Sequence, residues 1–197
     1  LRVLICYGNN LQSIPTLPST LVSLDCSGNS INALPSLPST LRKLECSHNI
    51  LTLLPALPAM LEELQFDYNN ISVVPNLPDS LQLLTCSANG IQTLPTLPST
   101  LIYLAVGGNN LSSLQIPPLL ETLRCGNNNL SQLPTLPSSL SDLDCSDNNI
   151  SVLPSLPTGL DYLDCGHNPI TQIPQLPPPL GTLKCNSTLI SSIPTLS

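Results

Sequence analysis

The sequence predicts a solenoid, in which one short unit is stacked on itself. We expect a parallel β-sheet on its concave face, an extended, polyproline-like convex side and almost no helix. The main observation is an internal repeat, because near-copies of residues 21–40 fill all 197 residues, and a fixed period in this range is typical of stacked supersecondary units. Alternating apolar residues at the start of each copy and a proline-rich stretch at its end support the same fold.

Ten copies make up a single predicted domain, residues 1–197. They begin at Leu1, Leu21, Leu41, Leu61, Leu81, Leu101, Leu120, Leu140, Leu160 and Leu180. Aligned, they read Leu-x-x-Leu-x-Cys-x-x-Asn-x-(Ile/Leu)-x-x-Leu-Pro-x-Leu-Pro-x-x. The first six positions alternate as a short strand requires, with positions four and six facing the core. Positions two, three, five, seven and eight should face outward, so the stacked strands present an open surface that carries the variable residues.

Position nine is asparagine in nine copies and Thr188 in the last. The asparagines are Asn9, Asn29, Asn49, Asn69, Asn89, Asn109, Asn128, Asn148 and Asn168. A buried turn must satisfy its backbone groups, and a side-chain amide offers both a donor and an acceptor. We therefore expect an inward ladder of asparagines with a structural role.

The Leu-Pro-x-Leu-Pro segment forms the return to the next strand. Proline fixes φ, removes a donor and pushes its predecessor toward extended geometry, so the return cannot be helical. A return this thin predicts a gently curved stack. Copy six is one residue shorter than the others, which predicts a local kink there.

All eight cysteines fall at position six of their copies, where Phe66 and Val106 stand in the other two. A position that accepts Cys, Phe or Val is a buried apolar slot in which cysteine serves as a small hydrophobic residue. Cross-strand spacing of about 4.8 Å exceeds the roughly 3.8 Å between the Cβ atoms of a disulfide. We expect free thiols, with disulfides or metal ligation as alternatives.

The complete repeat, Leu-x-x-Leu-x-(Cys/apolar)-x-x-Asn joined to Leu-Pro-x-Leu-Pro, resembles the short bacterial leucine-rich repeats of secreted effectors from animal pathogens, and the resemblance covers all ten copies. It implies a leucine-rich-repeat solenoid, and secretion into a host cell or to the bacterial surface. In that family the repeats bind host proteins, and some members add a helical hairpin in front and a ubiquitin-ligase domain behind. Repeats with cysteine at position six are also similar to those of surface or secreted proteins of environmental bacteria.

Charge argues against several classes of partner. The net charge is −7 with only five basic residues, whereas nucleic-acid binding and adhesion to anionic membranes need several cations. No apolar run is long enough for a membrane span. The chain does not begin with methionine, and we expect it to be a segment of a longer protein.

Most charged residues occupy outward strand positions, where equivalent residues of adjacent copies are lateral neighbours. Four opposite-charge pairs are predicted on this basis: Arg42 with Glu62, Lys43 with Glu63, Arg124 with Asp144, and Asp164 with Lys184. We expect them to stabilise the sheet surface rather than to contact a ligand, although ligand contact remains an alternative.

Two groups of outward residues are candidate binding sites. The acidic cluster lies in copies eight and nine and contains Asp142, Asp144, Asp147, Asp161, Tyr162, Asp164 and His167. Within it, Asp142, Asp147 and Asp161 are predicted to lack ion-pair partners, so it is either a solvated face, a surface for a basic protein or a site for a calcium-like ion. The third interpretation lacks the tight Asp-x-Asp-x-Asp-Gly loop that calcium favours.

The apolar cluster lies in copies five and six and contains Leu83, Ile102, Tyr103 and Ala105. Outward Leu, Ile and Tyr side by side are unusual on a soluble surface and are the residue types that anchor interfaces.

These observations favour a protein-binding module without cofactor or metal, in which the apolar cluster supplies affinity and the acidic cluster orients a partner with a basic patch. Ser146, Asp144 and His167 are the residue types of a catalytic triad, but an open sheet offers no cleft, so we do not expect an enzyme. The alternatives are a structural or surface repeat without a specific ligand, and a targeting arm for a ubiquitin-ligase-like domain elsewhere in a longer protein.

Overall fold

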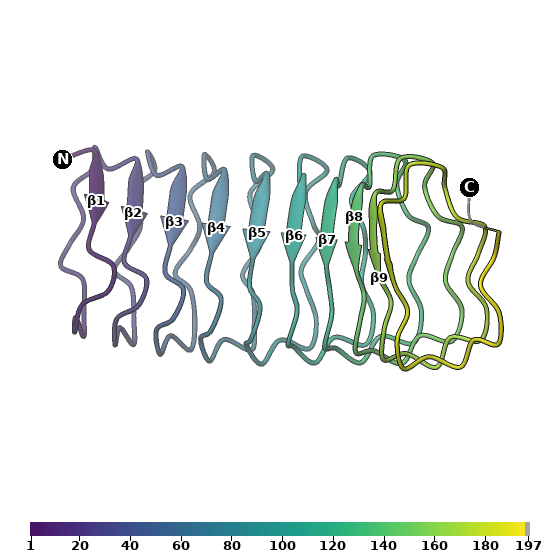
Figure 1. The fold of residues 1–197 in the computed structure, drawn as a ribbon. Helices are drawn as coiled ribbons and strands as arrows, with labels where there is room; N and C mark the ends of the chain where they lie inside the picture. Colours follow the sequence, from purple (N-terminus) through teal and green to yellow (C-terminus); the bar gives the residue numbers. More distant parts are fainter. Residues whose placement is uncertain (196–197) are drawn as a thin grey trace.

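The computed structural model describes residues 1–195, which form a solenoid of ten turns with one short strand in each (Figure 1). The strands are β1 (Val3–Ile5), β2 (Ser23–Asp25), β3 (Lys43–Glu45), β4 (Glu63–Gln65), β5 (Leu83–Thr85), β6 (Tyr103–Ala105), β7 (Thr122–Arg124), β8 (Asp142–Asp144), β9 (Tyr162–Asp164) and β10 (Thr182–Lys184). They follow chain order in one parallel sheet whose register aligns equivalent positions, such as Leu4 with Leu24. The predicted solenoid is confirmed.

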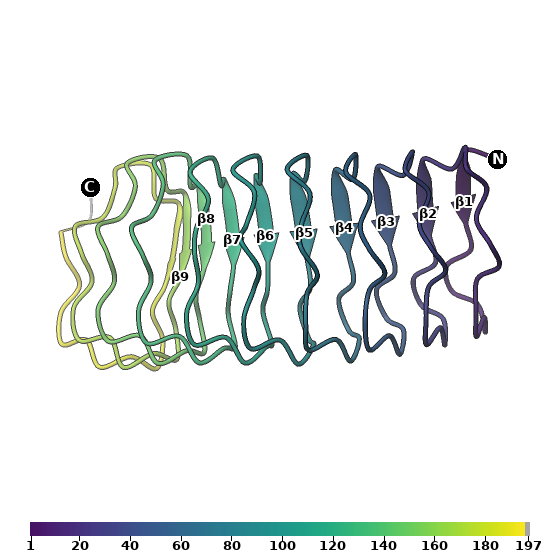
Figure 2. The same cartoon turned by 180° about the vertical axis from the view of Figure 1, so that it is seen from behind.

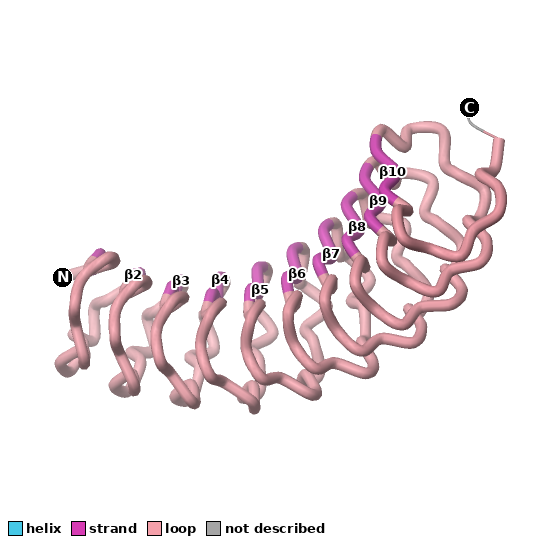
Figure 3. Tube along the Cα trace, turned by 60° about the horizontal axis from the view of Figure 1, so that its bottom comes forward, coloured by secondary structure: helices cyan, strands magenta, loops and turns pink. Residues whose placement is uncertain are grey.

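The stack bends into an arc with the strands on its inner side and the returns on its outer side (Figure 3). Viewed from behind, the returns are extended (Figure 2). Residues 1–195 contain no helix, and therefore no helix among them could span a membrane. Proline at the return accounts for this, because it blocks helix and supplies the turn before each strand. For example, the Pro38 carbonyl accepts from the Leu41 amide at 3.0 Å.

The core is a single apolar strip that runs the length of the solenoid. Leucines at positions one and four, the residue at position six and the Ile or Leu at position eleven are fully buried in the interior copies. Phe66 and Val106 are as inaccessible as the cysteines that occupy the same slot elsewhere. All eight cysteines are free thiols, six of them buried and Cys6 and Cys185 partly exposed at the two ends.

The asparagine ladder is present as predicted. The Asn49 amide nitrogen donates to the carbonyls of Cys26, Cys46 and Ser47 at 3.0 to 3.2 Å, and its oxygen accepts from the Ile31 amide at 2.9 Å. Each interior asparagine thus joins its own copy to the preceding one. In the last copy Thr188 keeps only part of this function, because its hydroxyl donates to the Cys185 carbonyl at 2.8 Å.

The missing residue of copy six leaves the sheet intact. Leu104 and Leu123 remain paired in register, and the Asn128 amide still donates to the Val106 carbonyl at 3.0 Å. The change is therefore absorbed in the return without interrupting the sheet, and a local kink at copy six stays a prediction. In the first strand Val3 and Ile5 occupy positions three and five, which were predicted to face outward, and both are exposed.

Candidate partner-binding face

The concave face consists of the outward residues of the ten strands and of the two positions that follow each strand. In the interior strands the central leucine is buried and its neighbours at positions three and five lie on the accessible side, as in β3 and β8. Because the sheet is parallel and in register, residues of one position form a row across the face. A residue's contacts are set by the adjacent members of its row.

Three of the four predicted ion pairs are confirmed. Arg42 pairs with Glu62, Lys43 Nζ lies 2.9 Å from Glu63 Oε2, and Lys184 Nζ lies 3.5 Å from Asp164 Oδ2. Lys43 also contacts Glu45 at 2.7 Å. Hydrogen bonds to Glu45 and Glu63 raise the pKa of Lys43. The Arg42 and Lys43 pairs are accessible to water, so each contributes about 0–1 kcal/mol to folding.

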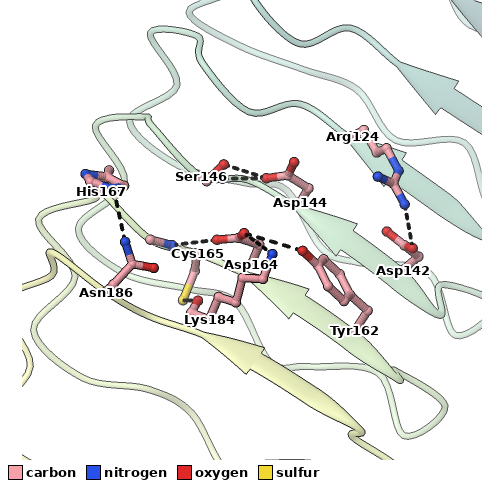
Figure 4. Close-up of polar contacts among 11 residues, drawn as sticks. Arg124, Asp142, Asp144, Ser146, Tyr162, Asp164, Cys165, His167, Lys184 and Asn186 are labelled. Atoms are coloured by element: carbon pink, nitrogen blue, oxygen red, sulfur yellow. Dashed lines mark hydrogen bonds and ion pairs between the residues drawn. The ribbon is translucent and has the colours of Figure 1, made fainter.

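The fourth predicted pair is wrong. Arg124 contacts Asp142, with Nη2 and Oδ2 3.0 Å apart, and not Asp144 (Figure 4). Asp144 already has two donors in its own turn, because its Oδ1 accepts from the Ser146 amide at 3.0 Å and the Ser146 hydroxyl at 2.7 Å. Asp142 is consequently not an unpaired carboxylate, although its Oδ1 is buried without a hydrogen-bond partner among the described residues.

The acidic cluster has register partners on β8 and β9, Asp142 with Tyr162 and Asp144 with Asp164, and part of its charge is engaged internally. Asp164 accepts from the Gly166 amide at 3.1 Å and from the Tyr162 hydroxyl at 3.4 Å, and Lys184 lies over the Tyr162 ring at 5.2 Å (Figure 4). The Tyr162 contact contributes most to raising the pKa of Lys184. The charge of Asp164 in copy nine is therefore partly neutralised by Lys184 of copy ten.

The remaining members of the acidic cluster lie at the two ends of the strands. Asp161 precedes β9, whereas Asp147 and His167 occupy position eight beyond the strand ends, and all three are exposed. His167 contacts Asn186, at 3.0 Å between the ring nitrogen and the amide nitrogen. In residues 1–195 no group of three or more His, Cys, Asp or Glu side chains is arranged to hold a metal ion.

Three of the four apolar-cluster residues lie together and are accessible. Leu83 and Tyr103 are register partners on β5 and β6 and are half-buried, and Ile102, just before β6, is 38% exposed. The inclusion of Ala105 as a contact residue is wrong, because it is only 8% exposed. Its short side chain lies in register between Thr85 and Arg124, so an outward position does not make it accessible.

The structure also shows a network that the sequence interpretation missed. The backbone amide at position seven donates to the position-five carboxylate of its own copy in three copies, at 3.0 to 3.1 Å: Ser27 to Asp25, Ser146 to Asp144 and Gly166 to Asp164. Aspartate two residues before a serine or glycine is the sequence signal for this local bond. Part of the acidic character of the face thus serves its own backbone.

A second missed feature is the left-handed backbone at position eight. His48, Tyr68, Ala88, Asn127, Asp147, His167 and Ser187 all have φ between 51° and 55° there. Such values are uncommon for residues other than glycine. Apart from Ala88, which is partly buried, these residues are exposed and form a row at the ends of the strands, where the His48 and Tyr68 rings stack with centroids 4.3 Å apart.

Ser146, Asp144 and His167 do not form the hydrogen-bonded arrangement of a catalytic triad. The Ser146 hydroxyl donates to Asp144, and the His167 ring contacts Asn186 instead of Ser146 (Figure 4).

Comparison with solved structures shows that this geometry is similar to that of the repeat domains of bacterial effectors. YopM from Yersinia enterocolitica WA-314 superposes with a TM-score of 0.90 and 36% identity, over 100% of this chain and 48% of that chain. The leucine-rich effector YopM from Yersinia pestis gives 0.79 and 30%, over 100% and 69%. A Shigella effector leucine-rich-repeat domain gives 0.71 and 36%, over 79% and 71%.

This chain spans about half of the Yersinia enterocolitica structure. No protein-family model and no curated protein matches it. The identity of 30 to 36% over more than two thirds of both the Yersinia pestis and the Shigella chains is nevertheless specific. The chain therefore belongs to the family of bacterial leucine-rich-repeat proteins that includes these Yersinia and Shigella effectors.

Proposed function

We propose that this chain is a protein-binding module, which uses the middle of its concave face to hold a partner protein and is not itself an enzyme. The observation that carries the proposal is the accessible group of Leu83, Tyr103 and Ile102 on adjacent strands. Large apolar side chains on an open sheet surface are costly in water, and such residues supply most of the binding energy in protein interfaces.

The exposed acidic residues next to β8 and β9, two to three strands from this group, orient the partner. Asp161 and Asp147 are exposed and, unlike Asp142 and Asp164, have no ion-pair partner among residues 1–195. With a net charge of −7, the face attracts a partner that carries a basic patch. Charges at a rim of this kind act on the association rate more than on the lifetime of the complex.

The similarity to secreted Yersinia and Shigella effectors supports secretion of this protein, into a host cell or to the bacterial surface. The proteins that it contacts there would be those met after export.

Replacing Tyr103 with alanine together with Ile102 with serine is expected to weaken partner binding by about thirtyfold or more, since truncating central apolar anchors costs roughly 2 kcal/mol or more. Partners would be captured from host-cell extract on immobilised wild-type protein, identified by quantitative mass spectrometry, and then measured individually by calorimetry.

Val73→Ser is the matched control, because Val73 is 73% exposed but lies on the return outside the sheet. Proteins retained equally by all three baits are background. If every captured protein binds the double variant as well as the wild type, the apolar cluster is not the binding site.

A further inference from the structure

We propose that Asn89 is a site of spontaneous deamidation, which takes place when copy five opens and which removes the ladder bonds between copies four and five. Asn89 belongs to the asparagine ladder and is followed by Gly90, and the dipeptide Asn-Gly occurs once in the chain. Glycine has no Cβ, so its backbone nitrogen can approach the preceding side chain more freely than that of any other residue. This dipeptide is therefore the most reactive sequence for deamidation.

The reaction needs only this dipeptide and water. The Gly90 nitrogen attacks Cγ of Asn89, a new N–Cγ bond forms, and the Cγ–Nδ2 bond breaks. The proton lost by the Gly90 amide leaves with Nδ2 as ammonia. Water then opens the succinimide ring at one of its two carbonyls, which gives aspartate or isoaspartate. No oxidant or enzyme takes part.

The folded ladder restrains both reacting groups. Asn89 Nδ2 donates to three carbonyls, among them that of Phe66 in the preceding copy at 3.1 Å, and Oδ1 accepts from the Ile71 amide at 3.0 Å. The Gly90 amide donates to the Ile71 carbonyl at 3.0 Å. The leaving nitrogen and the attacking nitrogen are thus both bonded in the fold, so the reaction requires a local opening, which costs less than global unfolding.

Copy five combines this reactive sequence with weaker shielding than most of the ladder. Asn89 is half-buried, as are Asn29 and Asn148, whereas the other interior members of the ladder are buried: Asn49, Asn69, Asn109, Asn128 and Asn168. Serine and asparagine follow Asn29 and Asn148, and their side chains hinder the attack. Asn89 is therefore the one half-buried ladder residue whose sequence also favours the reaction.

The product cannot replace the asparagine. An ionised aspartate has only acceptors, so it keeps the bond from the Ile71 amide but loses all three bonds to carbonyls. In isoaspartate the main chain passes through Cγ, and the added carbon displaces the turn. The same copy carries Leu83 of the apolar cluster on β5. This consequence for binding depends on the proposed function, whereas the deamidation does not.

The test follows deamidation in the full chain, incubated at neutral pH in native buffer and, in parallel, in urea. Proteolysis, mass spectrometry and chromatography then quantify aspartate and isoaspartate at each asparagine. We expect Asn89 to react first among the ladder asparagines, and more slowly in native buffer than in urea. The ratio of these rates measures the opening of copy five, and a hundredfold protection corresponds to about 2.8 kcal/mol.

Three results would overturn the proposal. Asn29 or Asn148 could react as fast as Asn89 in the native protein, which would remove the role of Gly90. Equal rates for Asn89 in native buffer and in urea would show that the fold does not restrain the reaction. Complete absence of native deamidation, while the unfolded chain reacts, would show that copy five does not open.

Gly90→Ala tests the attacking residue without disturbing the ladder. A Cβ at this position would lie 3.9 Å from the Ile71 carbonyl oxygen and 4.0 Å from the Ser72 Cβ, which are ordinary contacts, and the backbone there has no positive φ. Deamidation of Asn89 should slow at least several-fold, because the alanine side chain hinders the approach of the nitrogen. An unchanged rate would contradict the mechanism.

Asn89→Asp reproduces one product and tests the consequence. The ratio of unfolded to folded protein should rise about a hundredfold, since three hydrogen bonds are lost in a half-buried turn. Asn70→Asp is the matched control, because Asn70 is exposed at position ten. Urea unfolding measures both variants, and equal stabilities would refute the loss of the ladder bonds. Neither measurement needs a partner, so the outcome is independent of the capture experiment.

Discussion

Replacing Asn69 with alanine is expected to lower the free energy of unfolding by about 3–5 kcal/mol. The Asn69 amide nitrogen donates to the carbonyls of Cys46 and Phe66 at 3.1 Å, and its oxygen accepts from the Leu51 amide at 2.9 Å. Alanine leaves the Leu51 amide without an acceptor in a position that is only 6% exposed. The Cys46 and Phe66 carbonyls keep their bonds from Asn49 and Asn89 but lose the one from Asn69, and each such lost bond costs about 0.5–1.5 kcal/mol. Each buried polar group left unsatisfied costs about 1–3 kcal/mol.

Asn9→Ala is the matched control. Asn9 holds the same position in copy one but is exposed and donates only to Cys6 and Tyr7 of its own copy. Its loss should cost less than about 1 kcal/mol, because water replaces the amide. Urea unfolding of both variants measures the difference; equal losses would show that the ladder stabilises the fold locally within each turn rather than between turns.

Asn69→Thr offers an intermediate case that the chain already contains. In copy ten the Thr188 hydroxyl keeps the bond to the carbonyl of Cys185, but a hydroxyl cannot reach as many groups as an amide. We expect the threonine variant to lie between wild type and alanine. A stability equal to that of the alanine variant would mean that the bonds to the preceding copy carry the whole effect.

The fold was predictable because every copy buries its apolar residues and satisfies its turn with the same residue types at the same positions. Leucines at positions one and four, asparagine at nine and proline in the return recur at fixed spacing, so stacking them in register is the arrangement that buries every apolar position at once. Even the one-residue deletion in copy six was harmless to the sheet, because it falls in a return that makes no strand pairs.

The surface was less predictable because its residues differ from copy to copy and compete for partners. Arg124 had two carboxylates in reach, and the choice of Asp142 depended on Ser146 having already engaged Asp144. Ala105 has an outward position, yet its short side chain is only 8% exposed. Whether Tyr103, Ile102 and the exposed aspartates bind a partner stays a prediction, since it depends on a second molecule.

Raising the pH above about 9 is expected to unfold the protein cooperatively. Burial raises the pKa of the Cys26 and Cys165 thiols from an ordinary value of 9.0 to about 12, and it also raises the pKa of Cys46, Cys86, Cys125 and Cys145. In the folded state these thiols keep their protons between pH 9 and 12, whereas in the unfolded state they ionise. The folded state then binds more protons, so its stability is full below pH 9 and falls as the pH rises.

The magnitude follows from the number of buried thiols. Each contributes a slope of about 1.4 kcal/mol per pH unit above its unfolded pKa. The six buried cysteines together give about 8 kcal/mol per pH unit, comparable with the roughly 5–15 kcal/mol that stabilises a typical domain. Lys43 acts in the same direction, but only above its ordinary pKa of 10.5. The interval from pH 9 to 10.5 therefore isolates the thiols.

Two opposite substitutions in the same slot decide whether the thiols cause this loss. Cys86→Val follows the residue already present at Val106, which is fully buried, and should make the slope shallower by about 1.4 kcal/mol per pH unit. Val106→Cys should make it steeper by the same amount. Urea unfolding in reducing buffer from pH 7 to 10.5 measures the slopes, and absorbance of the thiolate reports ionisation. Burial of the position-six thiols is not the cause of the alkaline instability if the thiols ionise before the protein unfolds. The same conclusion follows if neither substitution changes the slope of the unfolding free energy against pH.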